Sequence, residues 1–192
     1  MPVGLTSHDL QAWHARGLTY DDYLAQTPDK SAPWRNNDAK CDLSEAQQSL
    51  LESFVREMKV IVISGVWCGD CSAQGPMLHA IASGSSKIDL KWLDKDSAIK
   101  LSDHVRINAG NRVPTVLFMA EDFEPVSVLG DRALARYRAI ASRQLGEACD
   151  LPSAQIPEDE FNETLQEWLD EFERVQLLLR LSARLRQKHS DE

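Results

Sequence analysis

The residues in this sequence that point most clearly to chemistry are two cysteines, Cys68 and Cys71, separated by Gly69 and Asp70. They follow a short β-branched run and precede a helical pattern, which predicts a strand-to-helix junction. Because N–H groups at a helix start stabilise an anion, Cys68 is expected to be the more acidic thiol. One helical turn brings the sulfurs close enough to form a disulfide. The pattern therefore predicts thiol–disulfide exchange, in which Cys68 attacks and Cys71 resolves the mixed disulfide.

Two other interpretations of the pair are structural thiols and half of a zinc site. Structural zinc normally takes four ligands, and only Cys41, Cys149 and scattered histidines remain to complete the set, with no second paired spacing. Redox chemistry is therefore favoured. Four cysteines are too few for a disulfide framework in 192 residues, and the N-terminus shows no secretory pattern. We expect a reducing, cytoplasmic compartment, in which Cys41 and Cys149 are structural thiols.

The elements expected around the pair predict an α/β sandwich built on a mixed sheet. Expected strands cover 60–64, 88–93, 113–119 and 125–129, and expected helices cover 6–16, 19–26, 44–58, 71–83, 97–107, 131–148 and 157–188. The polar, proline-containing segment 27–40 is expected to be a loop. These elements divide the chain into an N-terminal helical extension with a linker (1–43), a domain that holds the cysteine pair (44–149) and a long C-terminal amphipathic helix (150–192).

The last expected helix carries one continuous apolar stripe, with residues alternately four and three apart: Phe161, Leu165, Trp168, Phe172, Val175 and Leu179. A single helix over 158–188 would be about 46 Å long, longer than the diameter of a core of this size. We therefore expect an association or docking element. It would either form a homodimer of antiparallel helices or pack on the chain's own N-terminal helices.

The sequence resembles the thioredoxin superfamily over roughly residues 58–145. The segment Trp67-Cys68-Gly69-Asp70-Cys71 is similar to that family's Trp-Cys-Gly-Pro-Cys active site, and Pro76 matches the proline in its active-site helix. Val113-Pro114-Thr115 is similar to the family's cis-proline segment, and Gly130 matches a glycine near the same surface. The resemblance implies a thioredoxin-like fold with a mixed central sheet and helices on both faces, here with added N-terminal helices and a long C-terminal helix.

The resemblance also implies a substrate-binding surface beside the cysteines. Val113, which precedes the cis-proline Pro114, would offer its backbone N–H and C=O to an extended substrate segment. Trp67 would flank the groove. Gly69 and Thr115 are expected to belong to the same substrate-binding set.

Two features depart from the pattern of the resembled family. Its best-known members carry a buried Asp and a Lys partner where this sequence has Val62 and Trp92, so an apolar pair is expected to replace a buried charge pair. Asp70 replaces the active-site proline, as in a branch with Trp-Cys-Gly-Asp sites and extra N-terminal helices. Its carboxylate is expected to raise the pKa of Cys68 by repulsion, and as a catalytic residue it would take the proton from Cys71.

These observations together predict a cytoplasmic thiol–disulfide oxidoreductase that acts on disulfides of proteins or small thiols. It would need an upstream reductase or small-thiol reductant, and no metal or organic cofactor. The alternative is a thioredoxin-fold interaction or redox-sensing protein without sustained turnover.

Other classes of function are disfavoured. A net charge of −9 repels nucleic acids, and no apolar run is long enough to enter and cross a membrane. A peroxidase is disfavoured because no arginine lies in the cysteine motif. Four arginines of segment 131–148 are expected to form a solvated face: Arg132, Arg136, Arg138 and Arg143.

Overall fold

The cysteine pair follows the carboxyl end of an inner strand of a four-stranded mixed sheet in a computed structural model that describes residues 4–145 and 157–191. The strand order is β2-β1-β3-β4. The strands are β1 (Met58–Ser64), β2 (Ile88–Asp94), β3 (Thr115–Ala120) and β4 (Pro125–Gly130). β1 runs parallel to β2 and antiparallel to β3, and β3 pairs with β4 in an antiparallel hairpin. The mixed sheet predicted from the sequence is confirmed.

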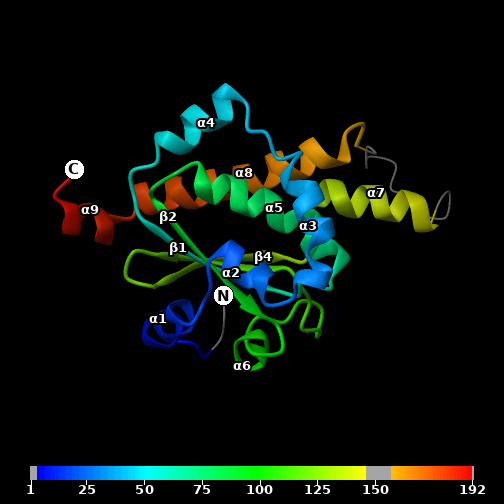
Figure 1. Cartoon of the computed structure of the whole chain (residues 1–192). Coiled ribbons are helices and arrows are strands. Elements are labelled where there is room, and N and C mark those ends of the chain that lie inside the picture. Colours follow the sequence, from blue (N-terminus) through cyan, green and yellow to red (C-terminus); the bar gives the residue numbers. More distant parts are fainter. Residues whose placement is uncertain (1–3, 146–156, 192) are drawn as a thin grey trace.

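Helices lie on both sides of this sheet (Figure 1). α5 (Gly69–Ser83) and α8 (Glu160–Leu181) run along one side, where α3 (Ala32–Asp38) packs on α5 and α7 (Leu134–Leu145) packs on α8. α1 (Ser7–Ala15) and α6 (Ile99–Ser102) lie on the other side. The remaining helical elements are α2 (Tyr20–Ala25), the short 3-10 helix η1 (Pro28–Lys30), α4 (Glu45–Glu52) and α9 (Ala183–His189). Because both sides are covered, all of β3 and nearly all of β1 are buried.

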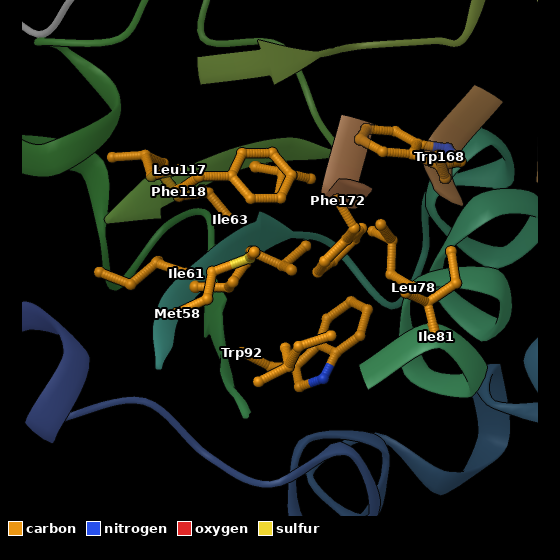
Figure 2. Close-up of a cluster of buried hydrophobic side chains, with 14 of the residues drawn as sticks. Met58, Ile61, Ile63, Leu78, Ile81, Trp92, Leu117, Phe118, Trp168 and Phe172 are labelled. Carbon is orange, nitrogen blue, oxygen red and sulfur yellow. The ribbon is translucent and has the colours of Figure 1, made fainter. Parts of the chain in front are cut away.

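Side chains from α5, α8 and the strands of the sheet form a buried core (Figure 2). Leu78 of α5 and Trp92 of β2 lie in the space next to Phe172 of α8. The ring of Phe172 meets the ring of Phe118 of β3 edge-to-face, with centroids 5.0 Å apart. Such aromatic contacts add to the stabilisation gained from burying apolar area. The C-terminal helix is therefore part of the core that supports the sheet.

The apolar stripe of this helix is buried within the chain itself. Leu165, Trp168, Phe172, Val175 and Leu179 are each at most 1% exposed. Their helix packs chiefly on α5 and α7, and Phe172 also contacts Phe118 of β3, so the expectation that the stripe packs on the N-terminal helices is wrong. Three leucines of α8 remain exposed, namely Leu177, Leu178 and Leu181. A homodimer through α8 stays a prediction, and it would have to use these residues.

The expected loop 27–40 is instead helical, and this prediction was wrong. Pro33 lies in the first turn of α3, where a helix needs no N–H donor from it. Trp34 is fully buried, and its Nε1 donates to the carbonyl oxygen of Val66 at 2.9 Å. A Cβ at Gly75 would lie 2.0 Å from Cζ3 of Trp34, so this glycine allows the close approach of α3 to α5. Asn37 Nδ2 also donates to the Ser72 carbonyl oxygen at 2.9 Å, so α3 holds the start of α5.

Several predicted helices have other limits in the structure. The helix predicted over 44–58 ends at Glu52, because Met58 already pairs with the sheet as the first residue of β1. The helix predicted over 97–107 has one turn only, Ile99–Ser102, and that predicted from 131 begins at Leu134. The single long helix predicted from Pro157 is two helices, because the backbone at Ser182 is extended. Residues 146–156, including Cys149, lie outside the described residues.

Candidate active site

Cys68 occupies the N-cap position of α5, directly after the loop that leaves β1. Its Sγ accepts a hydrogen bond from the backbone N–H of Cys71 at 3.4 Å, as a polar side chain at a helix N-cap does. Both cysteines are unbridged. Cys68 is partly exposed, whereas Cys71, one turn into the helix, is fully buried. The junction predicted from the sequence thus presents one sulfur to the surface and keeps the other behind it.

The two thiols differ strongly in acidity. Hydrogen bonding from Cys71 is the main cause that lowers the pKa of Cys68 to about 6, and backbone N–H groups of the first turn add to it. Burial and the charge of Asp70 oppose this shift. Burial is the main cause that raises the pKa of Cys71 well above its ordinary value, and the neighbouring Cys68 adds to it. At neutral pH the pair therefore holds one thiolate, and it resides on Cys68.

This asymmetry predicts the pH dependence of alkylation. Only a thiolate reacts rapidly, so the labelling rate of Cys68 with iodoacetamide should be half-maximal near pH 6, as its pKa of about 6 requires. Cys71 should stay nearly unlabelled over the same range, because it is buried and its pKa is raised. Mass-spectrometric mapping of labelled peptides between pH 5 and pH 9 measures both rates. Preferential labelling of Cys71 would contradict the assignment.

The segment around Pro114 lies against Cys68 Sγ. The Val113–Pro114 peptide bond is cis, in agreement with the resemblance. The Val113 carbonyl oxygen is 3.7 Å from Cys68 Sγ. Thr115 is buried, and its hydroxyl donates to the carbonyl oxygen of Arg112 at 2.8 Å, so it fixes this loop from inside. The structure thus brings the predicted segment to the cysteine pair, but it does not present the Thr115 hydroxyl at the surface.

The other two residues of the predicted substrate-binding set lie on the open side of Cys68. The side chain of Trp67 is 55% exposed, and the Lys95 ammonium lies 5.9 Å from the centre of its ring. Apart from its chain neighbours and the backbone of its own helix, no described atom lies within 4 Å of the position that a Cβ on Gly69 would take. A broad aromatic surface and an open backbone therefore flank the attacking sulfur.

Asp70 is held by two arginines that the sequence did not connect with it. Arg132 contacts its carboxylate through Nε at 2.9 Å and through a terminal nitrogen at 2.6 Å, and Arg136 Nε donates at 2.7 Å. The expectation that these two arginines form a solvated face is therefore wrong. Burial would raise the pKa of Asp70, but the hydrogen bonds and charges of the arginines outweigh it and lower this pKa. A carboxylate held in this way is a weak base, and two cations balance much of its repulsion toward Cys68.

The C-terminal helix reaches the cysteine helix through Gln74. This buried amide accepts hydrogen bonds from Trp168 Nε1 and from the Ala133 N–H, both at 3.1 Å, and donates to the Asp131 carbonyl oxygen at 3.0 Å. Gln74 therefore ties α5, α8 and the loop before α7 together, close to Arg132. Its signal in the sequence is an amide within an otherwise apolar or small-residue stretch of the helix.

The apolar replacement of the family's charge pair is confirmed. Val62 and Trp92 are partners in the parallel register of β1 and β2, and both are buried. Trp92 belongs to an aromatic cluster with Tyr20, Tyr23 and Trp34, in which its ring stacks on that of Tyr23 at 5.6 Å. The N-terminal segment therefore supplies aromatic side chains that pack around Trp92, next to Val62, where the best-known members of the family have a buried Asp.

Cys41 has the environment of a structural thiol. Its Sγ donates to the Asn37 carbonyl oxygen at 3.3 Å. Burial is the main cause that raises its pKa to about 11, and Asp38 adds to it. Such a thiol is almost entirely protonated at neutral pH and reacts slowly. Within the described ranges, no three or more His, Cys, Asp or Glu side chains gather as a metal site would need.

Comparison with known proteins agrees with this architecture. A family model described as thioredoxin matches residues 17–143. A crystal structure of a protein of unknown function from Pseudomonas aeruginosa superposes with a TM-score of 0.63 at 17% identity, covering 87% of this chain and 99% of that one. An HIV epitope scaffold superposes with a TM-score of 0.61 at 16% identity, covering 85% of this chain and 98% of its own. No curated protein matches. Because the family model spans more than half of the sequence and the fold agrees with it, the chain belongs to the thioredoxin family.

Proposed function

We propose that this protein is a thiol–disulfide oxidoreductase that reduces disulfides of proteins or small thiols. The observation that carries the proposal is the asymmetry of the cysteine pair. Cys68 is reachable from solvent and has a pKa of about 6, whereas Cys71 is buried and protonated. Attack by a low-pKa thiolate and resolution by a protected second thiol is the arrangement that disulfide exchange requires.

The exchange would proceed in two steps. The Cys68 thiolate attacks one sulfur of the substrate disulfide, forms a mixed disulfide and releases the other substrate sulfur as a thiolate. Cys71 then loses its proton and attacks Cys68 Sγ, which closes the Cys68–Cys71 disulfide and releases the second substrate sulfur as a thiol. The substrate gains two electrons and the protein loses two. An upstream reductase or a small-thiol reductant would return the pair to the dithiol.

The surroundings of Cys68 suit an extended peptide substrate. The Val113 backbone lies beside the sulfur, so a substrate segment could pair with it as an added strand does. The exposed ring of Trp67 would support the same segment from the other side. A reducing, cytoplasmic compartment suits this role. Among the described helices, none has both the length and the apolar character that crossing a membrane requires.

A turnover assay tests the proposal against the alternative of an interaction or sensor protein. Reduction of insulin with dithiothreitol as the reductant should be accelerated by the intact protein and not by a Cys68→Ser variant. The expected loss is at least about 100-fold, because the variant lacks the nucleophile. An intact protein that reacts once and shows no sustained turnover would favour the sensor instead.

A further inference from the structure

Two hydroxyl groups that are fully buried near the cysteine pair have no hydrogen-bond partner among the described residues. They are Oη of Tyr23, on α2, and Oγ of Ser64, the last residue of β1. Most buried hydroxyls are hydrogen-bonded, because leaving one unpaired costs free energy. Two unpaired hydroxyls close to each other therefore need an explanation other than stability.

Both residues lie close enough to Cys71 to interact with it electrostatically. The Ser64 hydroxyl and the Gly65 backbone act on the buried thiol and lower its pKa, against the larger effect of burial. Tyr23 is placed by its ring, which stacks on Trp92 with centroids 5.6 Å apart and 22° between the planes. Burial is the main cause that raises the pKa of Tyr23, and the nearby Ser64 hydroxyl lowers it, so the phenol keeps its proton at neutral pH and remains able to donate it in a hydrogen bond.

The charged and titratable groups around these hydroxyls are few. Tyr23 is influenced by Cys71, by Cys68 and by Asp94, the register partner of Ser64 on β2. Asp94 Oδ1 accepts from the backbone N–H of Asp96 at 2.9 Å, so it caps its own turn. Asp70, the carboxylate nearest to Cys71 in the sequence, is held by its two arginines. The groups near the resolving thiol therefore include two neutral hydroxyl donors, those of Ser64 and Tyr23. Val62, on the same strand as Ser64, supplies no carboxylate that could act in their place.

We propose that Ser64 and Tyr23 stabilise the Cys71 sulfur while it becomes a nucleophile in the resolving step. As the thiolate forms, the Ser64 hydroxyl turns to donate to the sulfur, which makes Ser64 a catalytic residue, and Tyr23 Oη then donates to Ser64 Oγ, which makes Tyr23 a positioning residue. Both hydroxyls keep their protons. The Cys71 proton ends on the departing substrate sulfur, while the new bond forms between Cys71 Sγ and Cys68 Sγ and the Cys68–substrate bond breaks. Buried donors that are already in place need little reorganisation as the charge develops.

This inference rests on the proposed function, and a single-turnover reaction separates the two. An aromatic disulfide whose released thiolate is coloured gives two absorbance phases, of which the first reports attack by Cys68 and the second reports resolution by Cys71. We expect Tyr23→Phe and Ser64→Ala to leave the first phase within about twofold and to slow the second about tenfold. The pH midpoint of the second phase should move upward in both variants, because a thiolate that loses a donor is harder to form.

Tyr20→Phe is the matched control. Tyr20 lies on the same helix and in the same aromatic cluster, but its hydroxyl donates to Asp38 Oδ1 at 2.8 Å. Tyr20→Phe should lower the thermal stability and leave the rate of the second phase unchanged. Tyr23→Phe, which removes an unpaired hydroxyl, should leave the stability unchanged and lower the rate of the second phase.

The outcomes are distinguishable. An intact protein that shows no second phase would contradict the proposed function and this inference with it. Two phases in the intact protein and unchanged second phases in Tyr23→Phe and Ser64→Ala would overturn the role of the hydroxyls alone. Equal slowing of both phases would overturn it as well, because it would indicate a general disturbance of the site.

Discussion

A Cys71→Ser variant is expected to stop after the first exchange and to remain covalently joined to its substrate through Cys68. The buried Cys71 thiol lies one helical turn from the attacking sulfur. A neighbouring thiol attacks with an effective molarity of about 10⁵ M or more, far above any millimolar external thiol. Turnover should therefore fall by at least about 100-fold, and the mixed disulfide should accumulate.

Non-reducing electrophoresis followed by mass spectrometry measures the trapped species. Adducts should appear with Cys71→Ser and disappear in the Cys68→Ser/Cys71→Ser double variant. Cys41→Ser, added to Cys71→Ser, is the matched control and should leave the adducts unchanged. The Cys41 thiol is half-buried and has a pKa of about 11, so it should trap nothing. Adducts that persist in the double variant would show that another cysteine attacks. The proteins recovered from a cell extract in this way would be candidate substrates.

Replacement of Trp168 by Ala is expected to lower the free energy of unfolding by about 3–5 kcal/mol. The side chain is completely buried, and its indole N–H donates to Gln74 Oε1 at 3.1 Å. The substitution would leave a cavity beneath α8 and remove one of the donors that satisfy the Gln74 amide oxygen. Since a domain is stabilised by about 5–15 kcal/mol in total, a loss of this size leaves little reserve.

Urea denaturation followed by far-ultraviolet circular dichroism measures this loss. Leu181→Ala on the same helix is the control, because that side chain is 76% exposed and its truncation should change the stability by less than about 0.5 kcal/mol. Similar small losses in both variants would contradict the assignment of α8 to the core. An unfolding midpoint that rises with protein concentration would instead support the predicted homodimer, because association stabilises by mass action.

The parts predictable from sequence were those with a local pattern. The β-branched run of β1 followed by Cys68 and Cys71 specifies a strand, a turn and a helix within about fourteen residues, so junction and chemistry could be predicted together. The segment containing Val113 and Pro114 was predicted from its resemblance to a known family. The position of Trp92 beside Val62 followed from that same alignment and is confirmed by the strand register.

The parts that escaped prediction depend on contacts between distant segments. Arg132 and Arg136 bind Asp70 across sequence separations of 62 and 66 residues. The residues that flank each arginine in the sequence do not indicate this contact. The two prolines of the expected loop were interpreted as helix breakers, but Pro33 lies in a first turn, where proline is tolerated. Burial of Tyr23 and Ser64 likewise becomes visible only in the folded chain, in which α2 packs on β2.

The dependence of the cysteine helix on α8 has a consequence for the order of events during synthesis. The sheet and α5 leave the ribosome before residues 160–181, so the apolar surface around Phe118 and Leu78 stays uncovered until α8 emerges. Gln74 meets Trp168 only then, and only then can Glu167 of α8 accept from the backbone N–H groups of Leu134 and Ala135, which follow Arg132. A nascent chain halted before α8 would carry both thiols next to an exposed apolar surface that promotes aggregation. A chaperone that binds exposed apolar segments would therefore meet this chain before the cysteine helix has its full support.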